Sequence, residues 1–242
     1  MKKKYEIKYH ILEENYWWFV GRRDFILKLL EYQNRNSQLL DIGCAGGSLI
    51  KALGKRGFSN ISGIDISEKA IKLCKKRGAM SVAVMEGTKL AFSDGAFDIV
   101  VASDILEHME NDLRALKEWK RVLKPSGKLI AFVPAFNALW SSHDDINLHY
   151  RRYSLSELRR LLKSAGFEIE RGSYWNFIVF FPFFLLTIWR KLYNKKKPDD
   201  NLYNFNAKVN ASLLRLLKFE NWLLRFFNFP VGISAFVIAK KK

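Results

Sequence analysis

The stretch that decides the fold is LLDIGCAGGSLI, which runs from Leu39 to Ile50. Its apolar start predicts a buried strand that ends at Ile42, and a helix is expected to begin near Ser48. The small residues between them let the backbone turn sharply and approach a ligand closely. The first N–H groups of the helix lack partners within the helix and point at this turn. We therefore expect a ligand on the turn.

Two acidic residues accompany this turn. Asp41 stands before the glycines, and Asp65 ends the next apolar strand, Ile61–Asp65. A carboxylate at the tip of a second strand can accept both hydroxyl groups of a ribose. A dinucleotide site of the NAD type has a different glycine spacing, G-x-G-x-x-G, so this stretch does not predict one.

Strands and helices alternate along the rest of the first half of the chain. Strands are expected at 39–42, 61–65, 81–85, 97–102 and 127–133, and helices at 24–32, 48–56, 67–77 and 110–121. A further helix at 154–165, strands at 167–174 and 231–239, and a helix at about 207–228 complete the chain. This order predicts an α/β fold: a doubly wound, Rossmann-like, mostly parallel seven-stranded sheet with helices on both faces.

Five motifs appear in the order typical of one enzyme family. They are the stretch from Asp41 to Gly47, VMEG at 84–87, FDIVV at 97–101, LEH at 106–108 and LKPSG at 123–127. With them the chain resembles the class I S-adenosylmethionine-dependent methyltransferases from about residue 39 to 167. Ala45 stands where that family usually has glycine. The resemblance implies S-adenosylmethionine as cofactor, contacted by Asp41, Gly43, Cys44, Ala45, Gly46, Gly47, Asp65, Ile66, Glu86, Gly87 and Ser103.

Each cofactor-binding loop has an expected partner on the ligand. Asp41 is expected to hold the amino group, Asp65 the ribose, and Glu86 the adenine amino group beside the Gly87 amide. Asp104 and His108 follow strand 97–102, where the methyl group and the acceptor should meet. With Glu107 they have a spacing that suits either the start of a helix or a divalent cation; we expect no metal.

The loop at 134–154 carries the most reactive side chains. Two histidines, two acids and two arginines lie within it: His143, Asp144, Asp145, His149, Arg151 and Arg152. We expect His149 or His143 to act as a general base, with Asp144 as orienting partner or alternative base. Arg151, Arg152 and Tyr153 are expected to bind the acceptor, the arginines through a phosphate or carboxylate.

A cluster of aromatic residues precedes the first strand. YWWFVGRR at 16–23 and SSHDDINLHYRRY at 141–153 resemble elements of a methyltransferase branch associated with glycan or lipid-linked glycan modification. Trp17, Trp18 and Arg22 are accordingly expected to contact the acceptor. The alternative is that the aromatic residues only seal the edge of the sheet.

The basic charge is concentrated in the last third of the chain. Residues 151–242 hold 18 basic and 6 acidic side chains, and the net charge is +17. Such a surface suits nucleic acid, an anionic membrane or a phosphorylated substrate. Two cysteines form no disulfide framework, and we expect no cleaved targeting segment. A cytoplasmic location is therefore expected, with peripheral contact at the inner face of the membrane.

A helical insertion is expected before the last strand. We divide the chain into a helical cap (1–38), the cofactor-binding core (39–174), the insertion (175–230) and a closing strand with a basic tail (231–242). The apolar run at 177–189 is too short to span a bilayer, and lysines at 195–197 follow it. These features favour a peripheral membrane contact at 175–197, while packing over the sheet or a dimer interface is the alternative.

The leading hypothesis is a methyltransferase that acts on an oxygen of a glycan- or lipid-linked acceptor at a membrane surface. The alternatives are a soluble small-molecule acceptor or a basic nucleic-acid-binding module, although the basic residues accompany an apolar run instead of spaced stacking aromatics. The acceptor and the oligomeric state are left open by the sequence.

Overall fold

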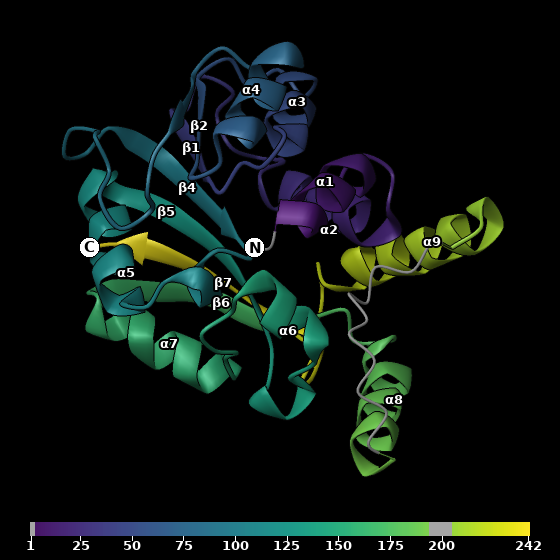
Figure 1. Ribbon diagram of the computed structural model, residues 1–242. Coiled ribbons are helices and arrows are strands. Elements are labelled where there is room, and N and C mark those ends of the chain that lie inside the picture. Colours follow the sequence, from purple (N-terminus) through teal and green to yellow (C-terminus); the bar gives the residue numbers. More distant parts are fainter. Residues whose placement is uncertain (1–2, 194–204) are drawn as a thin grey trace.

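A seven-stranded sheet in the order β3-β2-β1-β4-β5-β7-β6 forms the centre of the molecule (Figure 1). The computed structural model describes residues 3–193 and 205–242, with the backbone alone for 3–7 and 190–191. The strands are β1 (Leu39–Ile42), β2 (Ile61–Asp65), β3 (Val82–Val84), β4 (Phe97–Ser103), β5 (Leu123–Pro134), β6 (Phe167–Trp175) and β7 (Ser234–Lys241). Only β7 runs antiparallel to its neighbours, which confirms the predicted mostly parallel α/β fold.

Helices cover both faces of this sheet. They are α1 (Lys3–Leu12), α2 (Trp17–Leu29), α3 (Ser48–Gly54), α4 (Glu68–Lys76), α5 (Asp112–Val122), α6 (Ser142–Asn147), α7 (Leu155–Ser164), α8 (Phe180–Leu192) and α9 (Ala207–Leu223), with short 3-10 turns at Leu106–His108 and Asn137–Leu139. Along β4, Ile99 and Val101 join the core under α2, whereas Val100 and Ala102 join the core under α5 and α7. This alternation shows that the sheet is buried on both faces.

Two helix boundaries differ from the sequence prediction. The helix expected from Asp24 begins at Trp17, because Trp17, Gly21 and Phe25 form a buried face that the four adjacent aromatic residues obscure in the sequence. The helix expected at 207–228 ends at Leu223, and Phe227, which was assigned to that helix, is 62% exposed. That assignment was wrong because the chain leaves the helix one turn before Phe227.

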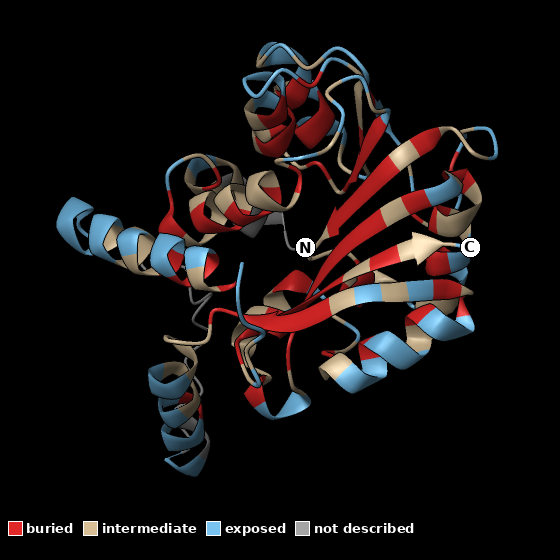
Figure 2. Ribbon diagram, turned by 180° about the vertical axis from the view of Figure 1, so that it is seen from behind, coloured by how far each residue is buried: buried red, intermediate tan, exposed pale blue. Residues whose placement is uncertain are grey.

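The segment between β6 and β7 carries α8 and α9 away from the sheet (Figures 1 and 2). The base of α9 packs on α2, where Asn221 donates a hydrogen bond to the carbonyl of Gly21 at 2.9 Å. The buried Glu220 accepts the N–H groups of Phe177 and Ile178 at 2.9 and 3.0 Å, which ties α9 to the chain before α8. Both helices are mostly exposed beyond this anchor. None of the described helices is long and apolar enough to cross a membrane.

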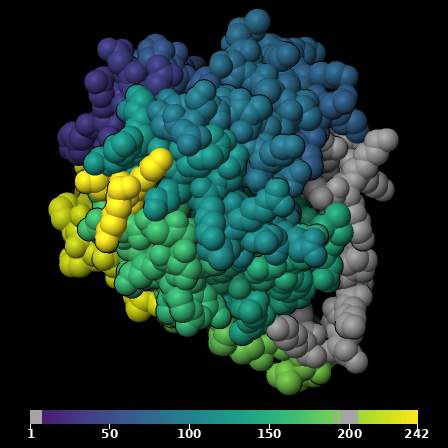
Figure 3. Space-filling view, turned by 90° about the vertical axis from the view of Figure 1, so that its left-hand side faces the viewer, coloured from purple at the N-terminus to yellow at the C-terminus, as the bar shows by residue number. Residues whose placement is uncertain are grey.

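The basic end of the chain lies far from these helices. Because β7 is antiparallel to β5, its last residues are at the edge of the sheet opposite the carboxyl ends of the parallel strands. Figure 3 shows the end of the chain in yellow on the surface, with α8 in light green at the lower margin. The C-terminal lysines therefore do not extend the charge of α8, and the expected lysines at 195–197 lie outside the described residues.

Candidate functional site

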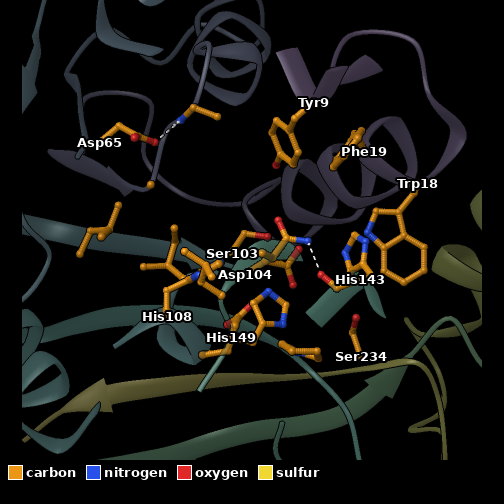
Figure 4. Close-up of a pocket in the computed structure, with 18 of the residues that line it drawn as sticks. Tyr9, Trp18, Phe19, Asp65, Ser103, Asp104, His108, His143, His149 and Ser234 are labelled. Atoms are coloured by element: carbon orange, nitrogen blue, oxygen red, sulfur yellow. Dashed lines mark hydrogen bonds between the residues drawn. The ribbon is translucent and has the colours of Figure 1, made fainter. Parts of the chain in front are cut away.

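A cavity of about 780 Å³ lies at the carboxyl ends of the parallel strands (Figure 4). Loops after β1, β2, β3, β4 and β5 line it, as the doubly wound fold predicts. The N-terminal helices and the start of α8 close its remaining sides. Of the residues expected to bind ligands, it is lined by Trp17, Trp18, Gly43, Ala45, Asp65, Ile66, Glu86, Gly87, Ser103, Asp104, His108, His143, His149 and Arg152.

The glycine turn has the sharply turned backbone that its small residues predict. Gly43 and Gly47 have φ angles of 75° and 80°, and Ala45 also has a positive φ, 47°. Ala45 therefore adopts a left-handed backbone conformation that glycine would accept without strain. Only Gly43 and Ala45 of this turn reach the cavity. Cys44, Gly46 and Gly47 lie behind it, where Cys44 and Gly47 pack against Cys74 of α4.

Asp65 is held at the tip of β2 by two backbone amides. Its carboxylate accepts the N–H groups of Ala45 at 3.0 Å and Ser67 at 2.9 Å, which links the glycine turn to the start of α4. Asp41 lies just behind this carboxylate and is 3% exposed. Burial, and secondarily the charge of Asp65, raises the pKa of Asp41 to about 7. Both acids thus lie near the ends of β1 and β2, as the sequence predicted. Only Asp65 lines the cavity, whereas Asp41 is outside its lining.

The loop after β3 forms the far end of the cavity. Glu86 is exposed and accepts a hydrogen bond from the hydroxyl of Thr88. The carbonyl of Gly87 accepts the indole N–H of the buried Trp119 at 2.8 Å, which fixes the backbone of this loop. Ile66 is 75% exposed at the rim of the cavity, and its expected contact with the cofactor stays a prediction.

Arg22 acts behind the cavity and does not line it. Its guanidinium is buried, donates to Ser103 Oγ at 3.0 Å and pairs with the Asp104 carboxylate. It also lies over the rings of Trp175 and Phe132, at 4.6 and 5.0 Å from their centroids. These contacts make Arg22 a positioning group for Asp104, whose φ of 55° is left-handed. Contact with an acceptor, expected of Arg22 from the sequence, stays a prediction.

His149 is oriented by a buried carboxylate. Its Nδ1 lies 2.9 Å from Asp144 Oδ1, and Asp144 is fully buried. Arg152 donates to both oxygens of that carboxylate at 2.8 and 2.9 Å. Although burial opposes the charged form, the hydrogen bond from His149 and the positive charge and hydrogen bonds of Arg152 hold the pKa of Asp144 well below its usual range. Because an ionised carboxylate can only accept, Nδ1–H of His149 donates the hydrogen bond to Asp144, and in the neutral imidazole Nε2 then carries the lone pair.

Glu107 and His108 lie beside His149 in an environment that opposes charge. Neither carboxyl oxygen of Glu107 has a hydrogen-bond partner among the described residues, and burial followed by the charge of Asp104 raises its pKa well above the usual value. Burial, and then the neighbouring His149, lowers the pKa of His108 to about 3. Glu107, His108 and His149 each offer a metal-ligand atom, all within 4.8 Å of one another. His149 thus takes the place given to Asp104 in the cation alternative, and the expected lack of a metal stays a prediction.

The arginines after His149 already have carboxylate partners. Arg151 pairs with Asp112 at 2.9 Å, away from the cavity, and Tyr153 donates to the same carboxylate at 2.9 Å. Burial and the neighbouring Asp112 raise the pKa of Tyr153 above its usual value. Arg152 lines the cavity with its charge directed to Asp144. Their expected binding of a phosphate or carboxylate therefore stays a prediction, and none of the three has an uncompensated charge.

The structure shows one contact that the sequence motifs did not predict. Glu13, at the end of the first helical region, is buried and accepts the N–H of Gly46 at 3.1 Å. Arg77 after α4 pairs with the same carboxylate and donates to the carbonyl of Gly46 at 2.9 Å. The helical cap is thereby attached to the glycine turn. Nothing near Glu13 in the sequence distinguishes it from the other charged residues of the first fifteen.

Comparison with known proteins points to one family. Residues 40–131 match the family model described as a methyltransferase domain. A probable S-adenosylmethionine-dependent methyltransferase of Mycolicibacterium smegmatis is 29% identical over 168 residues, 66% of this chain and 62% of its own. A ubiquinone biosynthesis O-methyltransferase of Idiomarina loihiensis is 27% identical over 150 residues, 54% of this chain and 61% of its own. The chain thus spans about three fifths of the length of these curated relatives.

A solved structure shares the fold. Phosphoethanolamine N-methyltransferase 2 of Haemonchus contortus, in complex with S-adenosyl-L-methionine, superposes with a TM-score of 0.62 at 20% identity, covering 91% of this chain and 52% of that one. The matched domain, the relatives and this fold agree with the order of motifs along the sheet. Residues 40–131 thus form a methyltransferase domain, and the chain around it is similar to class I S-adenosylmethionine-dependent methyltransferases in sequence and in fold.

Proposed function

We propose that this protein transfers the methyl group of S-adenosylmethionine to a hydroxyl oxygen, with His149 as the general base. The observation that carries the proposal is the hydrogen bond from His149 to the buried, ionised Asp144, inside a cavity that also holds Asp65. The donor set fits the cofactor, because strand-end carboxylates, backbone amides and an apolar rim meet a ribose, an amino acid portion and an adenine. When bound, the cofactor supplies an activated methyl group on a sulfonium.

The residues of this chain would divide the work between binding and proton transfer. Asp65 would accept the two ribose hydroxyls, and Asp41, which lies behind the cavity lining, would hold the ammonium group through a bridging water. At the other end, His149 would take the proton of the acceptor hydroxyl on Nε2, and the charge of Asp144 would stabilise the imidazolium that forms. Because the methyl donor is already strongly electrophilic, the fold contributes mainly proximity and alignment of the two substrates.

The acceptor proposed here is glycan- or lipid-linked and is met at a membrane surface. Large apolar side chains of α8 point outward, including Phe181 (50% exposed), Leu185 (66%) and Leu192 (76%). On α9, Phe219 stacks on Trp222 with ring centroids 5.8 Å apart, and both are about half exposed. Exposed basic residues accompany this surface on α9, namely Lys208, Arg215 and Lys218. Aromatic and basic residues together suit the headgroup region of an anionic bilayer.

Calorimetric titration tests the cofactor. S-adenosylmethionine and its demethylated product should bind, whereas NAD and single-stranded RNA should not. Methyl transfer is then measured with S-adenosylmethionine that carries a radiolabelled methyl group. A lipid extract and a water-soluble extract are compared as sources of the acceptor. Label that enters only the soluble extract would favour a soluble acceptor, and RNA binding without cofactor binding would overturn the proposal.

Co-sedimentation with vesicles tests the membrane contact. Binding should require anionic lipid, weaken as salt rises, and fall in Leu185→Asp. Met80→Asp is the matched control, because Met80 is 78% exposed and precedes β3, the edge strand opposite β6, and α8 follows β6 in the chain. Equal sedimentation of both variants and of the unaltered protein would show that α8 does not dock on the bilayer.

A further inference from the structure

The cavity has an apolar arm that the proposed chemistry does not use. Five side chains define this aromatic arm: Trp18, Phe19, Val179, Phe183 and Leu186. Figure 4 shows Asp65 at one end of the cavity and Trp18 with His143 at the other. The arm therefore extends the cavity beyond the residues expected to hold the cofactor.

Two distant segments build this arm. Trp18 and Phe19 belong to the first turn of α2, and the edge of Trp18 packs on the buried Trp175, with ring centroids 5.1 Å apart. Val179, Phe183 and Leu186 stand at the start of α8 with spacings of four and three residues, which places them on one helix face. The aromatic arm is thus a cleft between α2 and α8, with His149 and Arg152 lining the cavity it opens into.

The opposite face of α8 is also apolar. Phe181, Leu185, Ile188 and Leu192 repeat at helical spacing and are 39% to 76% exposed. One helix therefore presents apolar side chains both to the cavity and to the outside. A hydrocarbon chain that leaves a bilayer along the outer face would meet the aromatic arm without crossing a polar surface.

We propose that the acceptor is an amphiphile whose single apolar chain lies in the aromatic arm while its polar head reaches His149. This inference rests on the proposed function and names the substrate class of the same site. The cavity has a volume of about 780 Å³, which includes the aromatic arm as well as the end expected to hold the cofactor. Aromatic and branched aliphatic walls, without a charged side chain among the five, favour a hydrocarbon chain, which needs no polar partner.

Chain length is the variable that tests the proposal. Butyl, hexyl and octyl glucoside are titrated, below their micelle concentrations, into the protein loaded with S-adenosylhomocysteine. Each methylene group that enters an apolar site should raise the affinity by about fourfold, the equivalent of ~0.8 kcal/mol. An affinity that does not change along the series would overturn the proposal. Loading is measured first, so failure to bind S-adenosylhomocysteine is recognised separately as failure of the proposed function.

Two adjacent leucines provide a matched pair of variants. Leu186 lines the cavity, whereas its neighbour Leu185 is 66% exposed and outside the lining. Leu186→Asp should remove the dependence on chain length. Leu185→Asp should keep that dependence and lose only association with vesicles. If both substitutions abolish the dependence equally, the glucosides bind to the outer face of α8 and the aromatic arm is not their site.

A filling substitution checks the same site without adding charge. Val179→Trp should shorten the arm, so that octyl glucoside loses its advantage over hexyl glucoside while butyl glucoside binds as before. Binding of S-adenosylhomocysteine should not change, because Val179 comes from the α8 side of the cavity. An unchanged advantage of the longest chain in this variant would contradict the proposed place of the chain.

Discussion

The two ends of the cavity are built in different ways. At the cofactor end, Asp41, Asp65 and Glu86 stand at or just after strand ends, and their positions follow from the order of strands in a parallel sheet. At the acceptor end, α2, α6 and α8 all contribute, and α2 and α8 are more than 150 residues apart in the chain. The difference shows that the cofactor end depends on local motifs, whereas the acceptor end depends on long-range packing.

The carboxylates at the two ends also differ in their environment. Asp41 is buried near another acid, which raises its pKa to about 7. Asp144 is buried between Arg152 and His149, and these partners hold its pKa below the usual range. Asp41 is thus partly protonated near neutral pH and can ionise when a cationic group binds near it. Asp144, in contrast, is ionised at neutral pH.

Loss of the acceptor-end base should have the largest effect. His149→Ala should lower turnover by ~10²- to 10⁴-fold, the usual contribution of a positioned base, with cofactor affinity nearly unchanged. Steady-state rates and calorimetry on the same preparations separate the two effects. His143→Ala is the control and should cost less, because Asp144 orients His149. Full activity in both variants would leave proximity as the mechanism.

Replacement of Asp144, which orients His149, should destabilise the protein at the acceptor end. Asp144→Ala leaves Arg152 buried without its carboxylate, a change that costs about 3–5 kcal/mol of unfolding free energy, measurable by urea denaturation. Asp145→Ala, one residue further on and exposed, should cost well under half as much. The stabilisation from Asp144 is present above the unfolded pKa of an aspartate and is lost as pH falls below it, since its folded pKa is lowered.

At the cofactor end, removal of one strand-end acid should weaken binding only. Asp65→Ala should reduce the affinity for S-adenosylmethionine by about 1–3 kcal/mol, because two charge-assisted hydrogen bonds to the ribose are lost. Glu86→Ala should reduce it less, since Glu86 is exposed to water. Calorimetric titration provides both values. An unchanged affinity in Asp65→Ala would place the ribose elsewhere.

The smallest effect should be a pH dependence of cofactor binding. One unit below its pKa of about 7, roughly a tenth of Asp41 is ionised, so the affinity for a ligand ammonium should fall about tenfold. The affinity should rise again as pH increases through 7. Titration in buffers of different ionisation enthalpy would detect the proton released on binding. Asp41→Asn should bind more weakly and without this pH dependence; the same slope in the variant would assign it to another group.

The sequence by itself determined the sheet and the cofactor end. Strands β1 and β2 have the predicted bounds, because a short apolar run that ends in a turn is a local signal. Since the carboxyl ends of parallel strands share one edge, the loops after Asp41 and Asp65 had to converge once the strand order was known. The pairing of His149 with Asp144 was also within reach, because the two residues are five apart.

Only the tertiary structure decided what each charged side chain of the acceptor end does. Arg22 and Asp104 are 82 residues apart and meet because α2 packs across the end of β4. The attachment of Glu13 to Gly46 and the division of α8 into a cavity face and an outer face likewise depend on packing between distant segments. Residue type and spacing predict which groups can ionise or pack. The partner that is present after burial determines whether a group binds, positions another residue or stays neutral.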